Sequence, residues 1–167
     1  GHKGKPFIEN YVSPKLHFNI SHSHKVALFA FSHDSEVGID VEGPNPRLDY
    51  KAMAKRIMSK QEQRWIQSLP NAKQKFAFMV CWTRKEAFVK AHGTGLMFPL
   101  RDVTVTFLPN QPASLVKIEN PKLNSQIWSL HPIDARAQYV GALVVAGQPQ
   151  LIRYWDYQKW ESQMKIK

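Results

Sequence analysis

The strongest secondary-structure signal in this chain is a helix predicted over about residues 72–92, which stands between two groups of strand-like segments. Apolar and small side chains recur along it at helical spacing, and Gly93 provides a natural C-terminal stop. The stripe predicted to pack consists of Phe76, Met79, Val80, Thr83, Ala87 and Ala91. A long helix between groups of strands predicts an α+β fold, in which antiparallel strands pack with a cluster of helices.

Shorter elements flank this helix on both sides. Asp49 is a suitable N-cap for a helix over residues 50–58. Ser59, with Glu62 three residues later, has the capping-box spacing and predicts a second helix that ends near residue 69. The strand-like segments are residues 16–20, 25–32, 37–41, 103–107, 114–118, 126–130 and 138–145.

The length and composition indicate one ordinary domain. A chain of 167 residues is long enough for a core of its own, and we expect residues 1–150 to form the domain and residues 151–167 a peripheral helix or tail. The longest apolar run, residues 139–147, has the length of a buried strand and not of a membrane span. The single cysteine, Cys81, favours a reducing compartment, so we expect a cytoplasmic protein.

The net charge of +10 leaves several partners open: nucleic acid, an anionic membrane surface, a polyphosphate ligand or an acidic protein. The basic residues are spread along the chain without a dense block of Lys and Arg, which weakens the case for a nucleic-acid-binding arm. Charge alone does not rank the remaining partners.

Two carboxylates end the third strand-like segment, in the sequence GIDVE. Asp40 and Glu42 are two residues apart on a predicted strand, so their side chains leave the same face. A pair of carboxylates on a rigid element is suited to bind Mg²⁺ together with phosphate groups. The alternative is that both residues lie in solvent at the end of the strand.

The long helix carries a second group of candidates, in the sequence WTRKEAFVKA. Trp82, Glu86 and Lys90 are spaced four residues apart and share a helix face. Glu86 could complete a metal site of three carboxylates, and Lys90 could stabilise a phosphate leaving group. The alternatives are a surface Glu86–Lys90 ion pair and a core role for Trp82.

A third group of candidates lies near the N-terminus. Lys5, Ser21 and His22 combine a cation, a hydroxyl and an imidazole, which could hold a phosphate group. A lone histidine such as His22 is more often a half-buried structural residue.

Five segments occur in an order that resembles one enzyme family. They are GKP (residues 4–6), FNISHS (18–23), VGIDVE (37–42), WTRKEAFVKAHGTGL (82–96) and PL (99–100). In this order they resemble the 4′-phosphopantetheinyl transferases of the surfactin-synthetase-activating (Sfp) type. The resemblance covers about residues 4–107 closely and the later strands loosely, and it implies that family's fold.

The resemblance also implies a reaction: transfer of the 4′-phosphopantetheine arm of coenzyme A to a serine of an acyl or peptidyl carrier protein, with release of 3′,5′-ADP. Coenzyme A is polyanionic and carrier proteins are typically acidic, which would account for the basic charge. We therefore expect these two partners, and neither nucleic acid nor a membrane.

The family's motifs assign roles to individual residues. Asp40, Glu42 and Glu86 are implied as ligands of Mg²⁺, or of Mn²⁺ in its place. Glu86 is also implied to help deprotonate the attacking serine, and Lys90 to neutralise charge on the pyrophosphate. Coenzyme A phosphates would be held by Lys5, Ser21, His22 and Lys90. Glu62 matches a further glutamate of the family's pattern, to which we give a secondary role.

The chain departs from larger members of the family, in which a similar upstream half precedes the GKP motif. We expect either that this half has been removed or that the chain works by self-association. Residues 26–31 and 139–146 are apolar at nearly every position and should be covered on two faces. Without the upstream half, we expect some of that surface to be exposed or covered by another copy of the chain. Two other functions remain open: a basic nucleic-acid-binding module, and a catalytically silent domain that docks carrier proteins.

Overall fold

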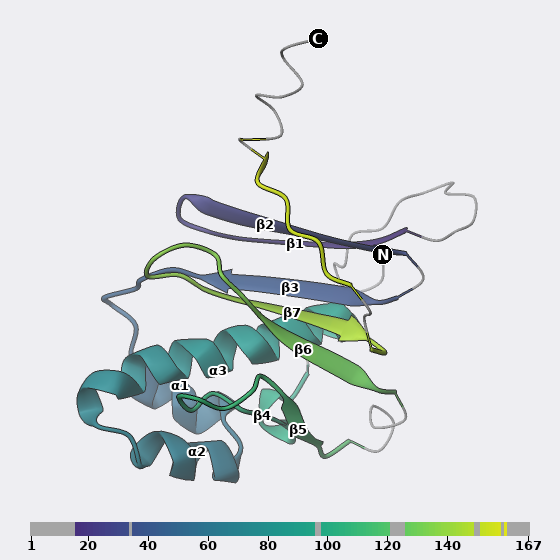
Figure 1. The fold of residues 1–167 in the computed structure, drawn as a ribbon. Coiled ribbons are helices and arrows are strands. Elements are labelled where there is room, and N and C mark those ends of the chain that lie inside the picture. Colours follow the sequence, from purple (N-terminus) through teal and green to yellow (C-terminus); the bar gives the residue numbers. More distant parts are fainter. Residues whose placement is uncertain are drawn as a thin grey trace.

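The computed structural model describes residues 16–33, 35–95, 98–120, 126–148, 151–157 and 159. The described part of the chain has an α+β fold, in which antiparallel strands pack with a cluster of α-helices, as the sequence predicts (Figure 1). In chain order the elements are β1 (Leu16–Ser23), β2 (Val26–His33), β3 (Val37–Glu42), α1 (Tyr50–Ile57), α2 (Lys60–Gln67), α3 (Asn71–His92), the 3₁₀ turn η3 (Leu100–Asp102), β4 (Val103–Val105), β5 (Leu115–Ile118), β6 (Trp128–Ile133) and β7 (Val140–Ala146). Among the described residues, no helix has the length and apolar character needed to cross a membrane.

A central antiparallel sheet of order β3-β7-β6 separates the two halves of the core. The helix α3 packs on one face of this sheet and the β1–β2 hairpin on the other (Figure 1). Strand β7 serves both sides: Ala142 and Val144 belong to the cluster around α3, whereas Leu143 and Val145 belong to the cluster with β2. The expectation that this strand is covered on two faces is confirmed.

The β1–β2 hairpin is attached to the central sheet by side chains and not by a backbone ladder. The side-chain oxygens of Asn19, Ser21 and Ser23 accept hydrogen bonds from the backbone N–H groups of β3 and the residue after it, at 2.9, 3.3 and 3.0 Å. Their partners are Ile39, Val41 and Gly43, each 20 residues further along. We call this row of three bonds the side-chain seam. It explains the alternating polar residues in the FNISHS segment.

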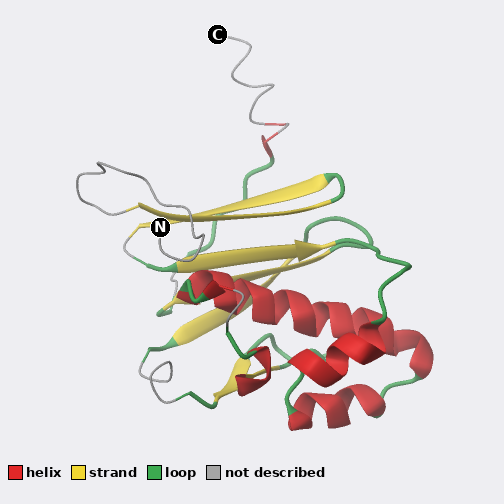
Figure 2. Ribbon diagram, turned by 180° about the vertical axis from the view of Figure 1, so that it is seen from behind, coloured by secondary structure: helices red, strands yellow, loops and turns green. Residues whose placement is uncertain are grey.

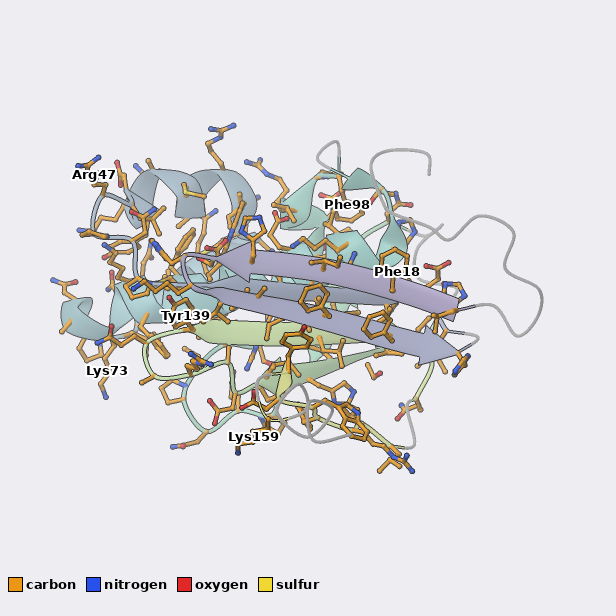
Figure 3. The ribbon with its side chains drawn as sticks, turned by 90° about the horizontal axis from the view of Figure 1, so that it is seen from above. Phe18, Arg47, Lys73, Phe98, Tyr139 and Lys159 are labelled. Atoms are coloured by element: carbon orange, nitrogen blue, oxygen red, sulfur yellow. The ribbon has the colours of Figure 1, made fainter. Side chains whose placement is uncertain are left out.

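The outer face of the hairpin is open. Phe29 is 58% exposed and Phe31 is 64% exposed, so β2 is covered on one face only. Phe18 stacks on Phe31 from the paired position of β1, and Ile20 lies opposite Phe29. Figure 3 looks down on this hairpin and labels Phe18. Part of the apolar surface of residues 26–31 is therefore exposed in the single chain, which is one of the two outcomes expected from the sequence.

The three helices lie together on the other side of the sheet (Figure 2). Their predicted capping residues are confirmed: Asp49 caps α1, Ser59 and Glu62 form the capping box of α2, and Gly93 ends α3 in the left-handed conformation. Burial extends around most of α3, because the sheet, α1, α2 and β4 all contact it.

Two details differ from the sequence prediction. Phe76, which was expected in the packed stripe of α3, is 59% exposed because it lies in the first turns of the helix, before the helix becomes enclosed. Strand β6 begins at Trp128 and continues through Pro132 to Ile133, whereas the sequence predicts a strand over residues 126–130. Strand β6 lies at the edge of the central sheet, where a missing N–H group is tolerated.

The segment after β7 has no regular secondary structure over residues 151–156. Ile152 is partly buried and packs against the cluster that contains Ala30, Leu143 and Val145. Leu151, Tyr154, Trp155 and Tyr157 are exposed.

Candidate functional site

The two groups of candidates from β3 and α3 lie against each other because the backbones of these elements make a close approach. A Cβ atom on Gly38 would lie 2.1 Å from the backbone nitrogen of Ala91 and 2.2 Å from the carbonyl oxygen of Ala87. Only glycine leaves room for this contact. Asp40 and Glu42 follow on β3, beside the helix.

Trp82, Glu86 and Lys90 form the half-exposed strip of α3. The residues between them, from Thr83 to Lys85 and from Ala87 to Val89, are buried. The predicted common face is confirmed, and it borders the two carboxylates of β3. The Glu86–Lys90 ion pair that the sequence left open as an alternative does not form between these described residues, because Lys90 turns to Asp40 instead.

Asp40 is buried and heavily bonded through one oxygen. Its Oδ1 accepts hydrogen bonds from Lys90 Nζ at 2.6 Å and from Ser21 Oγ at 2.9 Å. Its Oδ2 is also buried, and it has no hydrogen-bond partner among the described residues. An unpartnered carboxylate oxygen in the interior is costly, and a cation is one group that would satisfy it.

Glu42 is half-buried, and its Oε1 accepts a hydrogen bond from the indole Nε1 of Trp82 at 2.8 Å. Burial raises the pKa of the Glu42 carboxyl, an effect that the hydrogen bond from Trp82 opposes and the charge of Asp40 reinforces. The sequence interpretation favoured a core role for Trp82. Its ring does pack against the core, but its N–H group also holds a site carboxylate. The sequence feature that points to this hydrogen-bonding role is the spacing of four residues between Trp82 and Glu86, which places both on one helix face.

Glu86 makes no hydrogen bond or ion pair with another described residue. Burial, and then the charge of Asp40, raise the pKa of Glu86 to about 7. Lys90 lowers the pKa and Glu42 raises it further, each to a smaller extent. Glu86 is therefore a carboxyl that titrates near neutral pH beside two other carboxylates.

The three carboxylates are neighbours, but their oxygens do not converge on a common metal position. Among the residues that the structure describes, no group of three or more His, Cys, Asp or Glu side chains is arranged to hold a metal ion. The donors nevertheless fit a hard divalent cation, because all are carboxylate oxygens and Asp40 Oδ2 is left without a partner. Asp40, Glu42 and Glu86 are the residues that could hold such an ion.

The phosphate candidates are separated. Ser21 is buried toward Asp40, whereas His22 is exposed on the opposite face of β1, as alternation along a strand requires. Lys5 lies outside the described residues. Lys90 Nζ lies 2.9 Å from Ser21 Oγ, so Ser21 and Lys90 form one group with Asp40, and His22 is not part of it.

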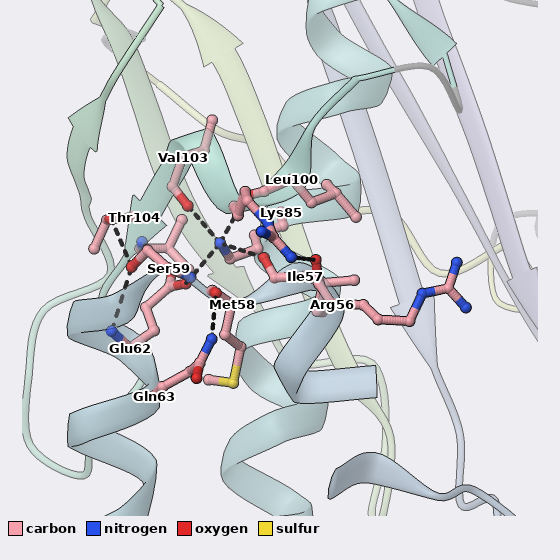
Figure 4. Close-up of polar contacts among 12 residues, drawn as sticks. Arg56, Ile57, Met58, Ser59, Glu62, Gln63, Lys85, Leu100, Val103 and Thr104 are labelled. Atoms are coloured by element: carbon pink, nitrogen blue, oxygen red, sulfur yellow. Dashed lines mark hydrogen bonds and ion pairs between the residues drawn. The ribbon is translucent and has the colours of Figure 1, made fainter. Parts of the chain in front are cut away.

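Glu62 lies in a separate, fully buried network (Figure 4). Its Oε2 pairs with Lys85 Nζ at 2.6 Å, and its Oε1 accepts from the backbone N–H of Val105 at 2.8 Å. Lys85 also donates to the carbonyl oxygens of Ile57, Leu100 and Val103. These bonds join α2, α3 and β4, so Glu62 has a structural role here.

Known proteins of one family resemble this chain. The family described as the 4′-phosphopantetheinyl transferase superfamily matches residues 36–144. The 4′-phosphopantetheinyl transferase HetI of Nostoc is 32% identical over 156 residues, which cover 93% of this chain and 62% of HetI. The 4′-phosphopantetheinyl transferase Sfp of Bacillus subtilis is 39% identical over 104 residues, covering 61% of this chain and 43% of Sfp. The chain thus spans about half the length of these relatives.

Solved structures support the same fold. The holo-[acyl-carrier-protein] synthase of Thermotoga maritima aligns with a TM-score of 0.51 and 27% identity, over 77% of this chain and 73% of that one. The ACPS–CoA complex of Chronobacterium ammoniagenes aligns with a TM-score of 0.51 and 15% identity, over 74% of this chain and 100% of that one. The second likeness concerns the fold alone.

Proposed function

Because this chain belongs to the 4′-phosphopantetheinyl transferase superfamily, we propose that it transfers the 4′-phosphopantetheine arm of coenzyme A to a serine of an apo acyl or peptidyl carrier protein. In this reaction the serine oxygen attacks the phosphorus of the arm, the phosphoanhydride bond breaks, and 3′,5′-ADP leaves with the bonding electrons. The observation that carries the proposal is the set of Asp40, Glu42 and Glu86 beside Lys90, contributed by elements within the matched segment.

The carboxylates have the chemistry for a divalent cation. Mg²⁺, or Mn²⁺ in its place, would when bound at Asp40, Glu42 and Glu86 neutralise the negative charge of a pyrophosphate group. The supporting observations are the unpartnered Asp40 Oδ2 and the three carboxylates that perturb one another.

Glu86 is the candidate general base. A base works best when its pKa lies near the working pH, and the pKa of Glu86 is raised to about 7 by burial and by the charge of Asp40. A carboxylate free of other hydrogen bonds can accept the proton that the attacking serine loses. We assign Glu86 this role in addition to ligation.

Lys90 is the candidate cation for the leaving group. Its ammonium group already bonds Asp40 Oδ1 and Ser21 Oγ, and so it is held within the site. Charge develops on the departing phosphate, and a fixed ammonium stabilises it more in the transition state than in the bound substrate.

Lys90→Ala should therefore lower kcat more than it raises the KM for coenzyme A. Steady-state kinetics with varied coenzyme A measure this, and the reverse pattern would assign Lys90 to substrate binding.

The surface around the helices supports an acidic partner. Exposed basic residues follow one another from the loop before α1 to the start of α3: Arg47, Lys51, Lys55, Arg56, Lys60, Arg64 and Lys73. The exposed acidic residue of the same stretch is Asp49. Arg47 and Lys73 extend outward at the helical end of the molecule (Figure 3). Such a surface attracts an acidic protein at low ionic strength.

The test is a transfer assay with a mass readout. The chain is incubated with coenzyme A, Mg²⁺ and an apo carrier protein, and the carrier should gain the mass of one phosphopantetheine arm. The same mixture with chelator, or with Glu86→Gln in place of the wild type, should leave the carrier unchanged. A chain that binds the carrier without modifying it would be a silent docking domain, and the proposal would fail.

A further inference from the structure

We propose that Trp82 and Ser21 are positioning residues, which decide which oxygen of Glu42 and which oxygen of Asp40 are presented to a divalent cation. Each engages one carboxylate oxygen with a neutral hydrogen-bond donor and leaves the other oxygen free. The inference rests on the proposed function, but it concerns two side chains that are not themselves ligands.

Trp82 is a fixed donor. Its ring packs against the main core cluster, and its Nε1–H donates to Glu42 Oε1 at 2.8 Å. The other oxygen of Glu42 makes no hydrogen bond with a described residue. An indole N–H only donates, so it can hold a carboxylate but cannot compete with one for a cation. The contact therefore selects one Glu42 oxygen for the site.

Ser21 acts on Asp40 in the same way. Its hydroxyl donates to Asp40 Oδ1 at 2.9 Å and lies within reach of two donors, the Val41 N–H at 3.3 Å and Lys90 Nζ at 2.9 Å. A hydroxyl has one donor and two acceptor positions, and all three are used here. Asp40 Oδ2 remains as the buried oxygen without a partner.

This arrangement gives Ser21 a different role from the one implied by the sequence resemblance, which was contact with a phosphate of coenzyme A. A phosphate ligand should mainly affect the KM for coenzyme A. A positioning residue should instead affect the affinity for the cation, and through it kcat. Partners that orient metal-bound carboxylates typically change metal affinity or activity by about 10- to 100-fold when they are removed.

The experiment compares two variants with two matched controls. Trp82→Phe keeps the ring and removes the N–H donor, and Ser21→Ala removes the hydroxyl. Trp65→Phe makes the same change at a tryptophan of α2 that packs on Phe107, away from the carboxylates. Ser23→Ala removes another bond of the side-chain seam, the one to Gly43 N–H at 3.0 Å. Neither control residue contacts Asp40 or Glu42 through any hydrogen bond of the described chain.

Mn²⁺ binding is measured by electron paramagnetic resonance without substrate, and kcat, the KM for coenzyme A and the Mg²⁺ activation constant are measured in the transfer assay. We expect Trp82→Phe and Ser21→Ala each to weaken Mn²⁺ binding and raise the Mg²⁺ activation constant by about 10-fold, with the KM for coenzyme A within about 2-fold. The controls should match the wild type, and Ser21→Thr, which restores a hydroxyl, should recover Mn²⁺ affinity.

Wild-type Mn²⁺ affinity in both variants would overturn the inference while transfer by the wild type upheld the proposed function. A raised KM for coenzyme A in Ser21→Ala, at unchanged Mn²⁺ affinity, would return Ser21 to the phosphate site and also overturn it. If the wild type neither binds Mn²⁺ nor transfers the arm, both proposals fail. If Trp82→Phe loses its thermal unfolding transition, the smaller change Ser21→Ala decides the outcome.

Discussion

At the scale of single residues, the carboxyl groups of the site differ in what holds them. Asp40 has an ammonium and a hydroxyl, Glu42 has an indole N–H, and Glu86 has no hydrogen-bonding partner among the described residues. The same chemical group therefore has opposite effects on stability in neighbouring positions. Removing Glu86 relieves repulsion and desolvation, whereas removing Asp40 leaves a lysine without its partner.

The first prediction concerns Glu86 and pH. The pKa of Glu86 is about 7 in the folded chain, against an ordinary value of 4.5. Because the pKa of Glu86 is raised in the folded chain, the contribution of Glu86 to the free energy of unfolding depends on pH. This contribution is fully present below about pH 4.5 and is lost as the pH rises through 7. Glu86→Gln should thus raise Tm at pH 8 by a few degrees, on the order of 1 kcal/mol after allowing for partial exposure, and change it little at pH 4.5. Thermal melts in chelator measure this. An equal shift at both pH values would contradict it.

The second prediction concerns Asp40. Asp40→Ala should abolish transfer and also lower Tm at pH 7, because Lys90 and Ser21 lose their shared acceptor. We expect the free energy of unfolding to fall by roughly 1–3 kcal/mol, toward the lower end of this range because Lys90 is partly exposed. Urea denaturation compares Asp40→Ala with Glu86→Ala, which should lose transfer without losing stability. Stabilisation by Asp40→Ala would show that carboxylate repulsion outweighs the ion pair.

At the scale of elements, the contact of β3 with α3 determines whether a site exists. Gly38 lets the strand touch the helix backbone at Ala87 and Ala91, which directly follow Glu86 and Lys90 in the chain. The third prediction is that Gly38→Ala lowers the free energy of unfolding by about 3 kcal/mol or more and abolishes transfer, because the new methyl group has no room. Gly147→Ala is the matched comparison: nothing lies within 4 Å, and its φ of +84° should cost only about 1 kcal/mol. Chemical denaturation of both variants measures the difference. Equal losses would contradict the close contact.

The sequence predicts most of these elements and part of the site. Some features depend only on residues that are close together in the sequence, and the sequence predicts them correctly. They are the capping box at Ser59, the helix stop at Gly93 and the common face of Asp40 and Glu42. What each site residue bonds depends on residues far away in the chain. The separation between Trp82 and Glu42 is 40 residues, and that between Lys90 and Asp40 is 50. Such pairings, like the exposure of Phe76, follow from packing between elements and not from periodicity.

At the scale of the whole molecule, the open face of the hairpin is a departure from a closed core. Ile20, Phe29 and Phe31 are all exposed on it, and Phe18 stacks beside them. Contiguous apolar surface of this kind marks an interface or an aggregation liability. The fourth prediction is that the chain self-associates, so its apparent mass in light scattering should rise with concentration.

The variant Phe29→Ser with Phe31→Thr should lower that apparent mass toward the monomer value. Phe76→Ser is the control, because Phe76 is equally exposed but lies on α3, on the other side of the sheet. A wild type that stays monomeric over the whole concentration range would contradict the prediction. An equal effect of Phe76→Ser would show that general hydrophobicity, and not this face, drives association.

The side-chain seam has a consequence for hydrogen exchange. The amide protons of Ile39, Val41 and Gly43 are held by side-chain oxygens of the hairpin, whereas the other edge of β3 is paired with β7. Exchange at these three amides therefore requires only that the hairpin detach, and this costs less free energy than unfolding the central sheet. Their hydrogen-exchange rates, measured by NMR, therefore report how often β1 detaches from β3. Since Ser21 belongs to both the seam and the carboxylate group, each undocking event also releases Asp40 from its hydroxyl donor.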